Sequence, residues 1–229
     1  MDGELPRADE DVARQAETFL GAGYPAIRAF GEMLAAEGVL RGLIGPREVP
    51  RLWERHLLNS AALLPYLPKT GTVADVGSGA GLPGIVLACA RPNLEVILVE
   101  PMERRATWLS DVVAALGLGS VQVIQRRAEE LHGQVAADVV TARAVAPLDR
   151  LMTWTFPLVR LDGVLLAMKG TRAQDEVAAA GTLIERLGGA PAEVLRAEVV
   201  PGVAPTSIVR VVRVRPAPPA RQPKRGRRR

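Results

Sequence analysis

The segment TVADVGSGAGLPG, residues 72–84, decides the fold of this chain. It begins as a short apolar strand, passes through Asp75 and Gly77, and continues through further glycines into the apolar segment IVLACA. Glycine removes a Cβ where a chain turns with positive φ or where a ligand approaches backbone, and the start of the next helix offers free N–H groups. This strand–turn–helix segment therefore predicts a ligand site built against backbone.

Two cofactors are compatible with these glycines. The G-x-G-x-x-G triplet that starts at Gly79 has the spacing of a dinucleotide fingerprint, and Glu100 lies about the right distance downstream to bind a ribose hydroxyl. A dinucleotide needs its first glycine directly after the strand, whereas this triplet starts two residues after Gly77. Asp75 would repel a diphosphate and suits the amino and sulfonium groups of S-adenosylmethionine. We favour S-adenosylmethionine, with a nicotinamide dinucleotide as the alternative.

Length and composition predict one domain with an appendage. The chain has 229 residues, of which 48% are hydrophobic, which is ample for a core. It has no apolar run near 18 residues, and its acidic start is unlike a signal peptide, so we expect a soluble, cytoplasmic protein with no membrane partner. The single cysteine, Cys89, excludes an internal disulfide, and two histidines leave little for a zinc site, so we expect no metal.

The positive net charge of +4 comes from the C-terminal end. From Arg215 onward there are seven Lys or Arg residues and no acid, so residues 1–214 carry a net charge of −3. The end of the chain is rich in proline and arginine and has nothing to bury, which predicts a disordered tail over 216–229. We favour the interpretation that this tail is an arm that attracts RNA phosphates, with a solvated chain end as the alternative.

Hydrophobic periodicity divides the rest of the chain in two. Residues 1–70 contain helical patterns at 11–21, 26–40 and 51–64 and no strand candidate. In 71–215, short apolar strands alternate with amphipathic helices, which predicts a parallel sheet covered on both faces. The expected strands are 72–76, 95–100, 121–125, 138–142, 163–169, 192–200 and 207–215.

The last two expected strands are joined by only PGVAPT, which is too short for a crossover helix. They should therefore form an antiparallel hairpin at the edge of the sheet, which differs from the second mononucleotide-binding half of a dehydrogenase. The predicted fold class is α/β, with a mostly parallel, seven-stranded, Rossmann-like sheet that ends in an antiparallel edge hairpin and is preceded by an N-terminal helical segment.

Charged side chains follow five of the expected strands. In an open α/β sheet, ligands bind outside the carboxyl ends of the strands, so residues there are site candidates. The sequence therefore predicts one shared site at this edge of the sheet. The residues at the five ends are Asp75, Glu100, the 126–129 stretch, Arg143, and Lys169 with Gly170.

Five sequence blocks, in order, resemble the glucose-inhibited division protein B family, bacterial 16S ribosomal RNA guanine-N7 methyltransferases. The blocks are RHLLNS (55–60), DVGSGAGLPG (75–84), RRAEE (126–130), TARA (141–144) and AMKG (167–170). The resemblance covers about residues 25–215. It differs at Asn59, where we expect Asp in many relatives, and in the arginine-rich tail.

The resemblance implies the methyltransferase form of this fold, with S-adenosylmethionine as the cofactor and 16S ribosomal RNA as the substrate. It also implies two sets of site residues. It implies cofactor contacts at Gly77, Leu82, Ala128 with Glu129, and Arg143. It implies basic catalytic-site residues at Arg127, Arg143 and Lys169. The implied partner is 16S ribosomal RNA or the small ribosomal subunit.

The residues suit N7 chemistry better than other methylations. A pyrimidine C5 methyltransferase needs a thiolate, and Cys89 falls within an expected apolar helix. Guanine N7 has its own in-plane lone pair, so its methylation needs positioning and no general base. We expect His56 and the three tryptophans, Trp53, Trp108 and Trp154, to be packing residues first. Two other functions stay open, a nicotinamide-dependent oxidoreductase and a non-catalytic ribosome-assembly or RNA-binding factor.

Overall fold

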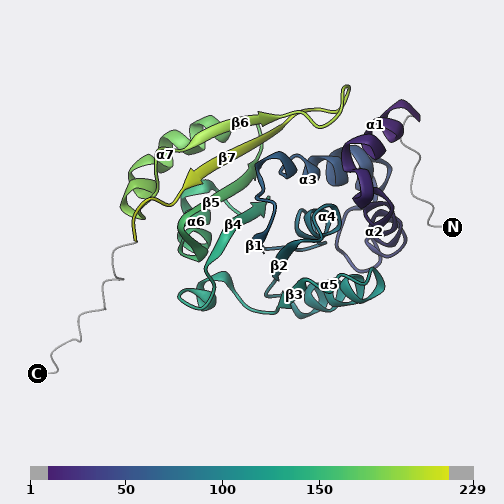
Figure 1. Cartoon of the computed structure of the whole chain (residues 1–229), viewed down its shortest axis with the longest axis horizontal. Helices are drawn as coiled ribbons and strands as arrows, with labels where there is room; N and C mark the ends of the chain where they lie inside the picture. Colours follow the sequence, from purple (N-terminus) through teal and green to yellow (C-terminus); the bar gives the residue numbers. More distant parts are fainter. Residues whose placement is uncertain (1–9, 217–229) are drawn as a thin grey trace, which may run out of the picture.

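A single seven-stranded sheet forms the centre of the molecule, with helices on both faces (Figure 1). The computed structural model describes residues 10–216. The strands lie in the order β3-β2-β1-β4-β5-β7-β6. Their bounds are β1 Gly71–Val76, β2 Leu94–Val99, β3 Val121–Ile124, β4 Ala137–Arg143, β5 Val159–Lys169, β6 Glu193–Ala197 and β7 Thr206–Val212.

All seven predicted strands are present, and the predicted hairpin is confirmed. Strands β1 to β5 pair in parallel, whereas β7 is antiparallel to both β5 and β6. The chain turns back after β6, inserts β7 beside β5 and leaves β6 at the edge. This arrangement differs from the 3-2-1-4-5-6 order of a dinucleotide-binding sheet.

Helices of the two faces build two hydrophobic cores. Helices α6 and α7 cover one face, and α4, α5 and the N-terminal helices cover the other (Figure 1). Ile27 and Phe30 of the N-terminal segment pack in the same core as Ile85 and Val73. The helix bounds are α1 Glu10–Leu20, α2 Tyr24–Glu37, α3 Asn59–Ala61, α4 Gly84–Ala90, α5 Glu103–Ala115, α6 Leu148–Thr155 and α7 Ala173–Arg186.

The third N-terminal pattern, 51–64, is not one regular helix, contrary to expectation. A 3₁₀ helix over Pro46–Arg51 leads into a π-helix, η3, over Leu52–Leu58, which is followed by the single turn of α3. The buried residues of η3 are Leu52, Trp53, Leu57 and Leu58, so burial repeats at a spacing of five. That spacing fits the wider π turn better than an α-helix, and π turns are frequent at functional sites.

Some predictions concern parts of the chain beyond the described residues. Apart from Pro216, the basic tail lies outside them, and the division into segments 1–70, 71–215 and 216–229 stays a prediction. Within residues 10–216, no helix has the length and hydropathy needed to cross a membrane.

Candidate functional site

A cavity of about 1400 Å³ opens at the carboxyl ends of the parallel strands. The ends of β1, β2, β4 and β5 contribute to its wall, as Rossmann-like topology requires. The N-terminal segment and the start of β7 close its other side. The predicted site residues on its wall are Gly77, Gly79, Leu82, Glu100, Arg127, Ala128, Glu129, Arg143 and Lys169.

The glycine-rich loop that follows β1 turns with positive φ angles and is hydrogen-bonded to β2. Gly77 and Gly79 have φ angles of +71° and +56°, a region that side-chain-bearing residues seldom adopt. The Gly77 N–H donates to the carbonyl oxygen of Val99, at 2.8 Å. Trp108, fully buried as expected of a packing residue, donates its indole N–H to the Ala80 carbonyl oxygen at 2.9 Å. The loop therefore presents backbone to the cavity from a fixed position.

Glu100 is a buried carboxylate at the end of β2 and is only 2% exposed. Its Oε2 accepts the Gly79 N–H and its Oε1 accepts the Met102 N–H, both at 3.0 Å. Arg105 lies 3.9 Å from Oε2. A carboxylate has about four lone-pair sites, so two remain for a ligand in the cavity.

Asp75, for which the sequence predicts a cofactor contact, is buried and is not among the described residues that line the cavity. The side chain is fully buried, and its Oδ2 accepts the Gly84 N–H at the start of α4 at 3.0 Å. Oδ1 has no hydrogen-bond partner among the described residues. Burial raises the pKa of Asp75 to about 7, against the lowering effect of the Gly84 hydrogen bond. The strand end alone did not reveal that this side chain turns towards α4.

Of residues 126–129, which follow β3, three line the cavity and one lies on the outer surface. Arg127, Ala128 and Glu129 line the cavity, with Ala128 buried at the start of a 3₁₀ turn, Ala128–Leu131. Arg126 instead turns to Gln134, with 3.3 Å between Nη1 and Oε1.

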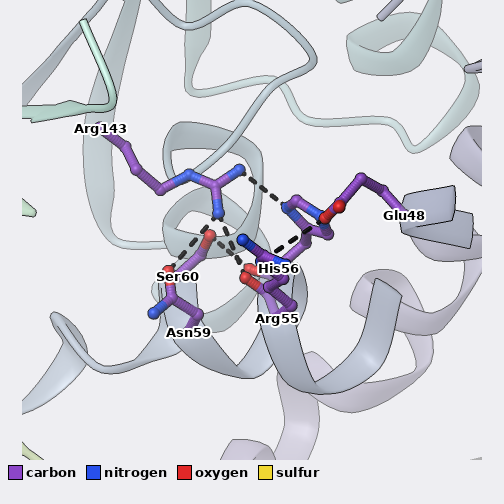
Figure 2. Close-up of polar contacts among 6 residues, drawn as sticks. All are labelled: Glu48, Arg55, His56, Asn59, Ser60 and Arg143. Carbon is purple, nitrogen blue, oxygen red and sulfur yellow. Dashed lines mark hydrogen bonds and ion pairs between the residues drawn. The ribbon is translucent and has the colours of Figure 1, made fainter. Parts of the chain in front are cut away.

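Arg143, at the end of β4, is enclosed by the N-terminal segment (Figure 2). Its Nη2 lies 3.2 Å from His56 Nδ1, and its Nη1 lies 3.4 Å from both Asn59 Oδ1 and the Arg55 carbonyl oxygen. Burial lowers the pKa of Arg143, whereas the negative charges of Asp75 and Glu48 raise it. A guanidinium remains charged under these conditions.

Lys169, at the end of β5, is held by the protein itself. Its side chain is 8% exposed, and Nζ donates to the Ala146 carbonyl oxygen at 2.6 Å and to Glu176 Oε2 at 2.8 Å. Burial raises the pKa of Glu176, but the hydrogen bonds from Lys169 and the Leu148 N–H outweigh it and leave that pKa below its ordinary value. Lys169 and Glu176 therefore form a charged pair on the cavity wall.

Sequence reasoning missed the contribution of the N-terminal segment. Glu48, His56 and Asn59 line the cavity, although we expected His56 to be a packing residue first. The sequence signal was that His56 and Asn59 fall within the RHLLNS block, whereas Glu48 lies seven residues before it. Trp53 fits its predicted packing role and stacks on Tyr24, with 5.5 Å between ring centroids, whereas Trp154 also reaches the cavity wall. Among the described residues, no group of three or more His, Cys, Asp or Glu side chains is arranged to hold a metal ion.

The sequence from residue 24 to 199 matches the GidB family model, described as rRNA small subunit methyltransferase G. The chain belongs to this family. A ribosomal RNA small subunit methyltransferase G from Nocardioides sp. is 56% identical over 202 residues, covering 88% of this chain and 80% of the relative. Its counterpart from Salinispora arenicola is 47% identical over 230 residues, covering 96% and 95%. The predicted family is confirmed.

Solved methyltransferase structures share the fold of this GidB family member. A precorrin-6y C5,15-methyltransferase from Geobacter metallireducens superposes with a TM-score of 0.52 at 17% identity, covering 74% of this chain and 90% of the other. A putative rRNA methylase from Clostridium thermocellum gives the same TM-score at 14% identity, covering 71% and 98%. These likenesses confirm the predicted fold class.

Proposed function

We propose that the cavity brings S-adenosylmethionine and a guanine of 16S ribosomal RNA together, and that the methyl group passes to guanine N7. The protein is, by family, an S-adenosylmethionine-dependent methyltransferase of small-subunit ribosomal RNA. The observation that carries the proposal is the size and lining of the cavity. Its volume of about 1400 Å³ exceeds the roughly 300–1000 Å³ of a typical small-molecule pocket, which leaves room for a base beside the cofactor.

The residues near β1 and β2 fit the cofactor. Gly77 and Gly79 present backbone without a Cβ, and the free lone pairs of Glu100 suit ribose hydroxyls. We assign further contacts to Leu82, to Ala128 with Glu129, and to Arg143, whose cation suits a carboxylate. Asp75 holds the start of α4 through Gly84.

When bound, S-adenosylmethionine supplies a methyl group on a sulfonium. The N7 lone pair forms the new bond to the methyl carbon while the carbon–sulfur bond breaks and its electron pair goes to sulfur, so no proton moves in this step. Positive charge then remains on the guanine imidazole ring, which a cation beside N7 would oppose. Arg127, Arg143 and Lys169 therefore suit phosphates, guanine O6 or the cofactor carboxylate.

The surroundings of the ionisable groups agree with a reaction that needs no base. Both ring nitrogens of His56 are engaged, by Glu48 and by Arg143. The Lys169 ammonium is paired with Glu176. We infer that these groups position the guanine and the cofactor. We also infer that the basic tail contacts RNA and that the protein works in the cytoplasm.

Calorimetric titration with S-adenosylmethionine and, in parallel, with NADPH tests the cofactor. Methyl transfer from labelled S-adenosylmethionine to 16S ribosomal RNA and to assembled small subunits tests the reaction, and mapping of N7-methylguanosine in cells with and without the gene tests the position. We expect binding of S-adenosylmethionine only, and one guanosine that loses its N7 methyl group. Binding without transfer to either substrate would instead support a non-catalytic factor.

A further inference from the structure

The N-terminal segment surrounds Arg143 with neutral hydrogen-bond acceptors. Its guanidinium faces His56 Nδ1, Asn59 Oδ1 and the Arg55 carbonyl oxygen (Figure 2). No carboxylate of the described residues accepts a hydrogen bond from Arg143 in the structure. Glu48 lines the same side of the cavity, and its hydrogen-bond connection to Arg143 runs through the imidazole of His56.

The hydrogen bonds define which nitrogen of His56 carries the proton. Arginine has five N–H donors and no acceptor, so Nδ1 must accept from Arg143 Nη2. The proton then lies on Nε2, which donates to Glu48 Oε2 at 2.7 Å. This chain of contacts requires a neutral imidazole, because a protonated ring would direct an N–H at the guanidinium.

We propose that neutral His56 is a positioning residue that aims Arg143 into the cavity, and that protonation of His56 releases Arg143 and slows methyl transfer. The inference rests on the proposed function. It adds His56, which lies outside the sheet, to the residues on which methyl transfer depends. His56 does not touch the reacting atoms in this account. It acts through Arg143 alone.

The groups that face His56 favour its neutral form near pH 7. Burial and the charge of Arg143 lower the pKa of His56, the hydrogen bond and charge of Glu48 oppose them, and the charge of Arg55 lowers the pKa further. These groups come from β4, from the 3₁₀ helix Pro46–Arg51 and from η3 itself. Acid should therefore disrupt the contact with a midpoint below the ordinary pKa of histidine.

Asn59 explains why this chain depends on the histidine. Both polar atoms of its side-chain amide make hydrogen bonds: Oδ1 accepts from Arg143, and Nδ2 donates to Thr206 Oγ1 at 2.6 Å. An amide oxygen binds a guanidinium less strongly than a carboxylate does. Asn59→Asp should therefore hold Arg143 by charge and reduce its dependence on His56.

The test combines kinetics with nuclear magnetic resonance on the full chain. Single-turnover methyl transfer to small subunits is measured from pH 5.0 to 8.5 for the parent and three variants. His56→Asn keeps an acceptor near Nδ1 but does not titrate, His56→Leu removes the acceptor, and His56→Leu with Asn59→Asp adds a carboxylate. The chain has two histidines, so His132→Gln assigns the imidazole signals.

The parent rate should fall in acid with the midpoint that the His56 resonances show, and the Nε2–H tautomer should dominate above it. His56→Asn should lose this inflexion, whereas His56→Leu should be about tenfold slower at pH 7.5, with most of the loss recovered by Asn59→Asp. A parent rate without the inflexion, an Nδ1–H tautomer, or a His56→Leu variant as fast as the parent would overturn the proposal.

The nuclear magnetic resonance titration of His56 tests this inference independently of the proposed function. Arg143→Ala removes a cation beside His56, so the midpoint of its imidazole should rise in that variant. This shift is measured without substrate. Absence of methyl transfer by the parent would refute the proposed function, whereas an unchanged midpoint in Arg143→Ala would refute the hydrogen bond between the two side chains.

Discussion

The Lys169 ammonium lies 2.8 Å from the Glu176 carboxylate, which joins the end of β5 to the first turn of α7. The same Glu176 oxygen accepts the Leu148 N–H at the start of α6. Lys169 also binds the Ala146 carbonyl oxygen, in the loop between β4 and α6 that lines the cavity. Lys169, on the wall of the cavity, thus also fixes a loop that lines it.

Replacing Lys169 tests whether it positions the substrate or acts as a base. Lys169→Ala should slow methyl transfer by about tenfold or more because the 144–147 loop loses its anchor, and Lys169→Arg should recover part of that loss. Between pH 7 and 9, the chemical step of the parent should stay flat. A tenfold rise per pH unit in the parent that Lys169→Ala abolishes would show that Lys169 is a general base.

Alanine at Gly77 should lower affinity for S-adenosylmethionine. A Cβ there would lie 2.8 Å from Val145 Cγ2, on the cavity wall, and the φ of +71° adds strain of about 1–2 kcal/mol. Gly117→Ala is a matched control, because Gly117 has a φ of +63° and nothing within 4 Å of an added Cβ. Calorimetry should show weaker binding for Gly77→Ala only, and equal affinities in two folded variants would contradict the assignment of this loop.

Asp75→Asn should change how stability depends on pH. In the folded state the pKa of Asp75 is about 7, against an ordinary value of 3.8, so the folded protein binds the extra proton between these values. Stability from this group is therefore present in acid and is lost as pH rises through 7. The asparagine variant lacks this loss, so its stability relative to the parent should increase by roughly 2–4 kcal/mol from pH 4.5 to 8. The free energy of unfolding of both proteins is measured by urea denaturation across this pH range. A difference between them that stays constant with pH would contradict the prediction.

Removal of the tail, residues 216–229, should weaken RNA binding and leave cofactor affinity unchanged. This segment carries six Lys or Arg residues and no acid. For every RNA phosphate that the tail neutralises, its removal should reduce the slope of log K against log salt by about 0.7–0.9. The control is a chain in which serine replaces those six basic residues, which keeps the length of the tail. Identical salt slopes for the parent and both variants would show that the tail does not contact RNA.

Strand-end residues were predictable because parallel strands end at one edge of a sheet. Glu100, Arg143 and Lys169 follow apolar strands that sequence periodicity identifies, and the structure brings them to one cavity. Asp75 follows the same rule in the sequence, yet its side chain points at the start of α4. The alternation of side chains near a strand end depends on where the turn begins, and the glycines leave that point undefined.

The sequence by itself determined the α/β alternation, the glycine loop, the C-terminal hairpin and the family, because these depend on local periodicity and on contiguous motifs. Only the tertiary structure decided that His56 and Asn59 meet Arg143, more than 80 residues away along the chain. Packing of the N-terminal helices onto α4 places them, and a π-helical turn directs His56 towards the cavity. A helical pattern shows which face is apolar, but it carries no information about which strand end the polar face will meet.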